Sequence, residues 1–493
     1  MLLAASNRRT VLAITAACVL VLFILGRHQT AYGTEGFDER GRSWKHRLCN
    51  VLMPDSSKVQ DIQAESVKHS RVAIASTFGF HHDVYLALAW TMERVMKEIG
   101  GRLQVYAPTP LNYAFQNIVD DLRLYSGEIK HQDDLLKDVT RNNGDGGIDM
   151  IVLGTCEFDL KGEWHTQLLA AWDARDSAHK FQIVCIVHHV LDKGWQGHIT
   201  EWARRDAIRL LPISAHVAKE FRTSFNELAD SFDPTIRTAG YEHIPIDVHV
   251  PVLDIPRLPE RSTERILSKA VIQGSFNQDR RDYANLFQDL SSSLAKDPSA
   301  WGYLPLGDGT AYSVNTTSKA PFHLFLIGSG HIEVPSELKD VVSVHVGLDY
   351  NQFYEMMGEM DICIPAFAEN GYYEHQASST FAMAVECEVP ILVTKRMRES
   401  YTYADDDRVV VTRPAAMREI AAIKALRSKN AVEFLDSDAS HTGHPVSENS
   451  HISYLVDEML SRGWTRTKSE YRSYKEDLWK DNEVVVQRLL RDL

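Results

Sequence analysis

The segment Asp361–Thr394 constrains the fold most, because its pattern predicts a strand, a loop, a helix and a second strand in succession. The first apolar run, 361–365, ends in a proline, and the loop behind it holds an Asn-Gly turn signal. Small and apolar residues recur at helical spacing over 377–387, and the β-branched run 389–393 predicts a buried strand. Neighbouring strands joined through a helix lie parallel, so the segment predicts an open α/β sheet.

The start of that helix carries hydroxyl side chains. Ser378, Ser379 and Thr380 stand at its N-terminus, just beyond the carboxyl end of the preceding strand. An open α/β sheet binds phosphate at this place, because free backbone N–H groups and the helix dipole both favour an anion there. The alternative interpretation is that the three residues only cap the helix, since Ser and Thr are common caps.

The same alternation of strands and helices fills most of the chain, which at 493 residues is too long for a single core. It predicts an α/β fold with two Rossmann-like domains. The predicted order is a cytosolic tail (1–10), an anchor or signal segment (11–26), a stem (27–67), a first domain (68–245), a linker (246–266), a second domain (267–426) and a C-terminal helical tail (427–493). Strands are predicted at 71–75, 103–106, 149–153, 183–187, 210–213, 269–274, 322–327, 341–346, 361–365, 389–393 and 408–411.

An apolar stretch near the N-terminus bears on location. Val11–Gly26 is a run of sixteen residues without a charge, preceded by Arg8 and Arg9. A membrane-spanning helix usually needs ~20 apolar residues, so this run suits either a thin endomembrane or a cleaved signal peptide. The two arginines favour an uncleaved anchor with its N-terminus in the cytosol. We therefore expect a single-pass type II protein of the endoplasmic reticulum or Golgi membrane, lumenal in its main part, and the glycosylation sequon at Asn315 agrees with this.

Charge and cysteine content narrow the partners. The net charge of −14 argues against nucleic acid as a partner. The cysteines at 156, 185, 363 and 387 lie in or beside apolar runs and are interpreted as buried thiols. A lumenal location would permit a disulfide, although the sequence does not call for one. No Cys-x-x-Cys or Cys/His spacing predicts a metal site.

Three segments carry a resemblance to a known superfamily. They are the strand and glycine turn Phe322–Gly330, the strand, short helix and strand of Val342–Phe367, and the strand-Ser-helix unit Leu210–Phe221. Their order and spacing resemble those of the GT-B glycosyltransferases over roughly Arg71 to Ala425, and the chain is also similar to fungal membrane-anchored members with a group 1-type C-terminal domain. The pattern departs where retaining members carry a second glutamate, because Phe381 stands there, or Met383 when the position is counted back from Pro390. The departure leaves the anomeric outcome open.

The resemblance implies two domains facing a central cleft and a sugar moved from a nucleotide-sugar donor to a glycan, protein or lipid acceptor. It implies no cofactor besides the donor and no protein-bound metal. The departing diphosphate needs positive charge, and Arg280 and Arg281 follow the first strand of the second domain, where the family places a basic group. The alternative is an exposed pair of arginines at a helix start. The other residues expected at the donor site are Gly274, Asn277, Gly328, Glu369, Glu374, Ser378, Ser379 and Thr380.

On the acceptor side, a hydroxyl must lose a proton to a base. His81, His82 and Asp83 follow the first strand of the first domain and are expected to face the cleft and serve an inverting reaction. His188 and His189 end another strand at the same sheet edge. The alternative for each pair is a packed or surface histidine. Two rival functions stay open: a GT-B-fold protein that binds a sugar nucleotide or glycan without turnover, and a sugar-nucleotide epimerase.

Overall fold

The computed structural model describes residues 70–493, apart from 142–146, 263, 308–310 and 319. The tail, the anchor or signal segment and the stem expected over 1–67 lie outside the described residues. Within the described part of the chain, no helix has the length and apolar character needed to cross a membrane.

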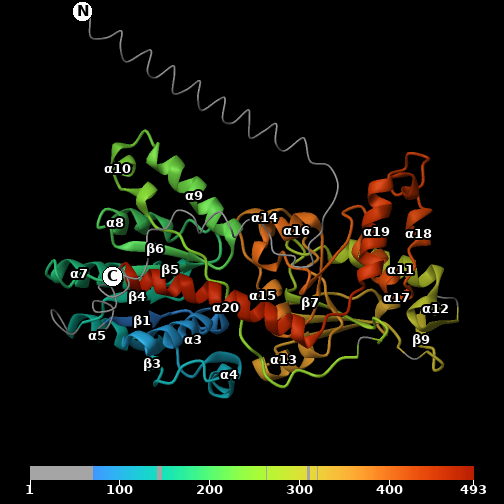
Figure 1. The fold of residues 1–493 in the computed structure, drawn as a ribbon, viewed down its shortest axis with the longest axis horizontal. Helices are drawn as coiled ribbons and strands as arrows, with labels where there is room; N and C mark the ends of the chain where they lie inside the picture. Colours follow the sequence, from blue (N-terminus) through green and yellow to red (C-terminus); the bar gives the residue numbers. More distant parts are fainter. Residues whose placement is uncertain (1–69, 142–146, 263, 308–310, 319) are drawn as a thin grey trace, which may run out of the picture. The chain divides into compact units, whose positions relative to one another are not determined.

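The first half of the described chain forms a six-stranded sheet with the strand order β3-β2-β1-β4-β5-β6 (Figure 1). All pairings are parallel. The order reverses between β1 and β4, as in a Rossmann sheet, and such a sheet binds ligands beyond the carboxyl ends of the strands at that reversal. The strands are β1 (Arg71–Ala75), β2 (Arg102–Ala107), β3 (Lys130–His131), β4 (Met150–Leu153), β5 (Gln182–Val187) and β6 (Ile208–Pro212).

Helices connect these strands and bury their apolar faces against the sheet. α3 follows β1 and ends at Gly100, whose left-handed backbone closes the helix with a bond from its N–H to the Met96 carbonyl. The helices are α3 (His82–Ile99), α4 (Phe115–Leu122), α5 (Asp134–Arg141), α6 (Cys156–Asp159), α7 (Glu163–Ala174), α8 (Ile199–Ala203), α9 (Ala215–Ala229) and α10 (Pro234–Arg237). We call β1 to α10 the first lobe.

A second parallel sheet has the order β11-β10-β7-β12-β13-β14, which repeats the connectivity of the first. The segment Asp361–Thr394 contributes β12, α15 and β13, although its strands are shorter than expected because the chain leaves the sheet early. The strands are β7 (Lys269–Ser275), β10 (His323–Ser329), β11 (Val342–Val346), β12 (Ile362–Cys363), β13 (Ile391–Val393) and β14 (Val410–Thr412).

The helices of this second lobe, which runs from β7 to α19, follow the same alternation. An insertion after α11 adds α12 and an antiparallel hairpin of β8 (Tyr303–Leu306) and β9 (Ala311–Val314), and Asn315 of the sequon directly follows β9. The helices are α11 (Tyr283–Lys296), α12 (Pro298–Trp301), α13 (Tyr350–Gly358), α14 (Gly371–Glu374), α15 (Ser379–Glu386), α16 (Lys395–Ser400), α17 (Glu419–Ser428), α18 (Val432–Leu435) and α19 (Ser450–Arg462).

The last helix, α20 (Lys468–Arg491), contacts both lobes (red in Figure 1). Near its start, Lys475 Nζ lies 3.1 Å from a carboxylate oxygen of Glu388 in the second lobe. One turn later, the ring of Trp479 packs 5.2 Å from that of Trp90 on α3 in the first lobe. The Asn482 side chain then bonds both the N–H and the C=O of a residue in the linker. Helix α20, the last part of the predicted helical tail, is therefore a strut between the lobes.

A disulfide joins Cys156, at the start of α6, to Cys185 in β5. The interpretation of these two residues as free thiols is therefore wrong, whereas Cys363 and Cys387 are buried and free. The bond forms because α6 begins just after β4, the neighbour of β5, which brings the two Cα atoms to 5.4 Å. It fixes the start of α6 against the sheet edge.

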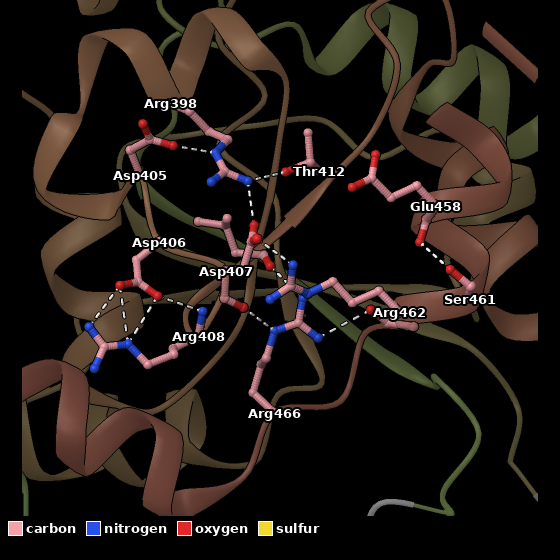
Figure 2. A network of polar contacts seen from close by, with 12 residues as sticks. Arg398, Asp405, Asp406, Asp407, Arg408, Thr412, Glu458, Ser461, Arg462 and Arg466 are labelled. Atoms are coloured by element: carbon pink, nitrogen blue, oxygen red, sulfur yellow. Dashed lines mark hydrogen bonds and ion pairs between the residues drawn. The ribbon is translucent and has the colours of Figure 1, made fainter. Parts of the chain in front are cut away.

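A charged network holds the outer end of the second sheet (Figure 2). Arg398 of α16 donates to Asp405 (2.6 Å) and to Asp407 (2.5 Å), and Asp407 also accepts from Arg462 at the end of α19. Burial opposes ionisation of Asp407, but the two guanidinium groups outweigh it and lower its pKa. Since these cations already have internal partners, the network fixes α16 and α19 to the loop before β14.

Candidate active site

The loop that follows β1 is held by one buried carboxylate. Asp159 of α6 accepts from the Thr77 N–H (2.6 Å), the Thr77 hydroxyl (2.8 Å), the Ser76 hydroxyl (3.2 Å) and the Thr155 N–H (2.8 Å). Burial raises the pKa of Asp159 to about 6 despite these bonds. The carboxylate ties the loop after β1 to the loop after β4, at the reversal of strand order in the first sheet.

Of the three residues expected to act as base, His82 is engaged internally. Its Nδ1 lies 2.6 Å from the Tyr85 hydroxyl, and its Nε2 accepts the Asn112 N–H at 3.3 Å. Burial lowers its pKa to about 4. With both ring nitrogens occupied in a buried setting, His82 fits a positioning role in the loop rather than contact with substrate.

Asp83 is also buried, and it faces the second lobe. The Tyr350 hydroxyl of α13 donates to it at 3.5 Å. Burial raises the pKa of Asp83 and that of Glu386. The nearby charge of Asp83 raises the pKa of Glu386 further. Glu386 itself accepts from the Leu253 N–H of the linker at 2.9 Å. These carboxyls belong to the contact between the lobes.

His81 is the remaining member, and it lies in a line of contacts that begins at Glu157. The Glu157 carboxylate accepts the His189 N–H at 3.0 Å and lies 3.4 Å from the Nδ1 of His188. Burial opposes its ionisation, but the charge of His188 and these bonds outweigh it and lower the pKa of Glu157. The ring of His188 packs 4.3 Å from that of His81, and its Nε2 is buried without a hydrogen-bond partner among the described residues.

His81 itself sits at a strained position, with a φ of 59° just before α3. Its Nδ1 lies 3.4 Å from the Thr155 hydroxyl. Burial, with a further effect from His188, lowers the pKa of His81 to about 3. The imidazole is therefore neutral at pH 7, as a residue that accepts a proton must be, although such a pKa makes it a weak base.

The two lobes meet beside this histidine line. The Ala377 N–H donates to the His188 carbonyl at 3.0 Å, and the Val190 N–H donates to the His375 carbonyl at 2.9 Å. Residues 188–190 follow β5 and residues 375–377 lie in the loop between β12 and α15, so each segment comes from the carboxyl edge of its own sheet. The edges at which Rossmann sheets bind ligands are thus brought together.

Arg280 lies close to this junction. It contributes to lowering the pKa of His189, after burial and His375. Its backbone is fixed, because its carbonyl accepts the Ala368 N–H at 3.1 Å. The side chain is half-buried, and no carboxylate within the described ranges forms an ion pair with it. The structure thus places Arg280 on the second lobe, near His189 of the first.

Arg281 has a different environment from the one expected. Its side chain is buried, and it donates to the Pro365 carbonyl and, at 2.8 Å, to the Thr380 hydroxyl. Thr380 in turn donates to Gln273. The Ser378 hydroxyl caps α15 by accepting the Thr380 N–H at 3.4 Å, and it donates to the Thr380 hydroxyl at 3.0 Å. Through these bonds Arg281, Ser378 and Thr380 hold β7, β12 and α15 together. Among the hydroxyls at this helix start, Ser379 is the exposed one.

The glycines and the asparagine also have local explanations. Gly274 and Gly328 lie opposite each other in β7 and β10, and a Cβ on Gly328 would stand 1.8 Å from the Gly274 carbonyl oxygen. A Cβ on Gly274 would stand 2.6 Å from the Arg281 guanidinium. The Asn277 side chain accepts the Asp279 N–H at 2.8 Å and shapes the turn before α11. Strand packing and turn geometry account for all three.

The two glutamates of the expected donor site differ from each other. Glu374 pairs with Arg396 of α16 at 3.1 Å. Glu369 is exposed, and a Cβ on Gly371 would lie 3.2 Å from its carboxylate and 3.4 Å from the Nε2 of His375. The side chains of Glu369 and His375 therefore both lie beside Gly371.

Sequence reasoning did not identify Glu157, Asp159 and His375, which organise this junction. Glu157 and Asp159 follow β4 at the same sheet edge as the histidines that follow β1 and β5. The rule that led to His81 would therefore have found them if it had been applied to β4. No sequence pattern pointed to His375, because it joins the junction only through its contact with the first lobe. Within the described ranges, no three His, Cys, Asp or Glu side chains gather closely enough to hold a metal ion.

No protein-family model and no curated protein matches the chain. Several solved structures do. One is an alpha-glucosyltransferase in complex with UDP and a 13-mer DNA, with 11% identity and a TM-score of 0.46 over 83% of this chain and 99% of that one. A lipopolysaccharide outer core galactosyltransferase matches with 11% identity and a TM-score of 0.38 over 83% and 98%. An O-GlcNAc transferase mutant of Thermobaculum terrenum matches with 13% identity and a TM-score of 0.41 over 87% and 69%.

Proposed function

We propose that this protein is a glycosyltransferase that moves a sugar from a nucleotide-sugar donor to a hydroxyl group of an acceptor. The observation that carries the proposal is the junction between two Rossmann sheets of the same strand order. There the carboxyl edges meet through residues 188–190 and 375–377, with Arg280 near His189. A guanidinium without an acidic partner in the described ranges, at the binding edge of such a sheet, suits a diphosphate.

In this proposal each accessible residue has one role. Arg280 and the N-terminus of α15 at Ser379 stabilise the charge that develops on the departing nucleoside diphosphate. Glu369 accepts hydrogen bonds from ribose or sugar hydroxyls. His81 accepts the proton of the acceptor hydroxyl while the new carbon–oxygen bond forms and the bond to the diphosphate breaks. Glu157 and His188 are positioning residues, which hold the ring of His81 from behind.

The test is donor binding and slow donor hydrolysis by the full-length protein, across UDP-, GDP- and dTDP-sugars. Arg280→Ala should weaken donor binding roughly tenfold or more, because a hydrogen bond to a charged group is worth ~1.5–3 kcal/mol. Arg102→Ala is the matched control, since this exposed arginine begins β2 at the opposite edge of the first sheet. Absence of binding and hydrolysis across the panel, or equal losses in both variants, would contradict the proposal.

A second candidate is a protein that binds a sugar nucleotide or glycan without turnover. The observation that favours it is the state of the expected base residues, since His82 and Asp83 are engaged internally and the pKa of His81 is lowered to about 3. The two candidates differ in turnover. A transferase loses it in His81→Ala while donor binding stays, whereas a binding protein hydrolyses no donor even as wild type.

The proposal includes a location in the lumen of the secretory pathway, as a single-pass type II membrane protein. The Cys156–Cys185 disulfide supports it, because disulfides persist in oxidising compartments. The apolar run Val11–Gly26 and the sequon at Asn315 support it as well. Protease protection of the protein in sealed microsomes, with the mass of its mature N-terminus, tests both the side of the membrane and the retention of the anchor.

A further inference from the structure

A group of exposed aromatic rings lies beside His81, and the reaction outlined above uses none of them. Phe80, Tyr113 and Phe158 have 44%, 46% and 45% of their surface exposed, which is unusual for three neighbouring aromatic side chains. The Phe78 ring stacks on that of Phe158 at 4.0 Å and lies 5.1 Å from that of Phe80 and 5.0 Å from that of His81. The Tyr113 ring lies 6.0 Å from that of Phe80. We call Phe78, Phe80, Tyr113 and Phe158 the aromatic platform.

The platform is assembled from three separate connections at one sheet edge. Phe78 and Phe80 lie in the loop after β1, Tyr113 in a short 3-10 turn after β2, and Phe158 in α6 after β4. Because parallel strands end at the same edge, these loops converge beside the reversal of strand order. Rings that are distant in sequence are therefore placed on one side of the candidate base.

Hydrogen bonds within and between the loops hold the platform in place. Asp159 fixes the start of the loop after β1, as described above, and the Phe78 N–H donates to the Ser76 hydroxyl at 3.1 Å. The Asn112 side chain donates to the Gly79 carbonyl at 2.7 Å and so ties the turn that carries Tyr113 to the same loop. Tyr113 adopts a left-handed backbone with a φ of 53°. Exposed rings held in fixed loops, one of them on a strained backbone, are the arrangement expected of a binding surface.

The polar groups at the rim of the platform distinguish between a nucleic acid, a lipid and a sugar as its ligand. The ammonium group of Lys161 lies 5.4 Å from the centre of the Phe158 ring and pairs with Asp192 at 2.7 Å. The rim is thus polar but carries no excess of positive charge, on a protein of net charge −14. A nucleic acid would require cations for its phosphates, and a lipid chain would require continuous apolar surface. A sugar ring offers an apolar C–H face for stacking and hydroxyls at its edge for polar rim groups.

We propose that the aromatic platform binds the acceptor, and that the acceptor is a carbohydrate whose ring stacks on Phe80 and Phe158 with a hydroxyl directed at His81. This deepens the proposed function and rests on it for the reaction, but binding to the platform can be measured without turnover. The proposal narrows the acceptor from a glycan, a protein or a lipid to a glycan.

The experiment titrates the full-length protein with defined oligosaccharides of two to five glucose, mannose, galactose or N-acetylglucosamine units, and follows binding by calorimetry and saturation-transfer NMR. The variant is Phe80→Ala with Phe158→Ala. The control is Phe232→Ala, because Phe232 is fully exposed in another part of the first lobe. Phe80→Tyr with Phe158→Tyr keeps the stacking faces and serves as a rescue. Circular dichroism verifies that each variant is folded.

We expect the alanine pair to weaken oligosaccharide binding roughly tenfold or more, because both stacking faces are lost at once. The tyrosine pair should recover oligosaccharide binding, and Phe232→Ala should bind oligosaccharides and hydrolyse the donor as wild type does. Equal binding by the alanine pair, or tighter binding of single-stranded poly-dT or of phospholipid vesicles than of every oligosaccharide, would overturn the platform proposal. If wild type hydrolyses no donor but binds a glycan through the rings, the transferase proposal fails while the platform stands.

Discussion

Arg280 and Arg281 are adjacent in sequence but have opposite environments. Arg281 is buried and clamps the Pro365 carbonyl and the Thr380 hydroxyl, whereas Arg280 is half-buried without an acidic partner in the described ranges. Neighbouring residues at a strand-to-helix turn point in different directions, so one guanidinium supports the turn while the other has no such bonds among the described residues.

This contrast gives a stability prediction. Arg281→Ala should lower the free energy of unfolding by ~2–3 kcal/mol, because it removes charge-assisted bonds and leaves buried acceptors without donors. Arg280→Ala should change it by less than ~0.5 kcal/mol, as expected for a side chain without such bonds. Denaturant unfolding measures both. If the two variants are equally stable, the clamp assigned to Arg281 is wrong.

For single residues, the sequence predicted the position in the fold better than the role of the side chain. It placed Arg280, Arg281, His81 and His82 correctly just beyond strand ends, because strand ends follow from apolar patterning. It did not separate Arg280 from Arg281 or His81 from His82, because which side chain turns inward depends on partners such as Thr380 and Tyr85. Thr380 comes from a distant part of the chain. Tyr85 lies one turn further along α3, and the sequence pattern does not fix where that helix starts.

At the scale of elements, α6 and its disulfide organise the edge of the first sheet next to His81. This four-residue helix carries Glu157, Phe158 and Asp159, and its first residue, Cys156, is bonded to β5 by the disulfide. Isolated helices this short are unstable in water. The disulfide and the bonds to Asp159 therefore determine where the helix lies.

Replacing both cysteines, Cys156→Ser with Cys185→Ser, should lower the free energy of unfolding by ~3 kcal/mol, because the bond closes a loop with a sequence separation of 29 residues. Dithiothreitol should lower the melting temperature of wild type to that of the variant and leave the variant unchanged. Scanning calorimetry with and without reductant provides the measurement. A wild-type protein indifferent to reductant would argue against the disulfide.

The elements themselves were predictable to different degrees. Every predicted strand is present, and β1 has the predicted bounds, because buried parallel strands are continuous apolar runs. The two-residue strand β3 and the β8–β9 hairpin were missed. β3 is polar, with a half-buried Lys130 and an exposed His131, and the hairpin exposes Leu304 and Leu306. Short or half-exposed strands leave no such run to detect.

Over the whole described molecule, the main departure from the sequence prediction is the role of α20. The charged C-terminal pattern predicted a helical tail, yet Tyr471, Tyr474 and Leu478 are buried, and Trp479 packs against α3 of the first lobe. The periodicity of a helix reveals an apolar face but does not identify its partner. The partner is α3, and the contacting residues Trp90 and Trp479 are about 390 residues apart along the chain.

Because α20 contacts both lobes and the linker, we expect the lobes to unfold together in one calorimetric transition. Trp479→Ala removes the packing on Trp90 and the bond from the indole N–H to the Val252 carbonyl at 2.9 Å. It should lower the melting temperature and split the transition in two, since interfaces between lobes of one chain are otherwise small enough to separate. Val484→Ala is the control, because this residue lies on the same helix with 53% of its surface exposed, and it should melt as wild type does. A single transition at an unchanged temperature in Trp479→Ala would mean that the lobes are joined mainly by the direct contacts at residues 188–190 and 375–377. The candidate active site would then itself be the main connection between the lobes.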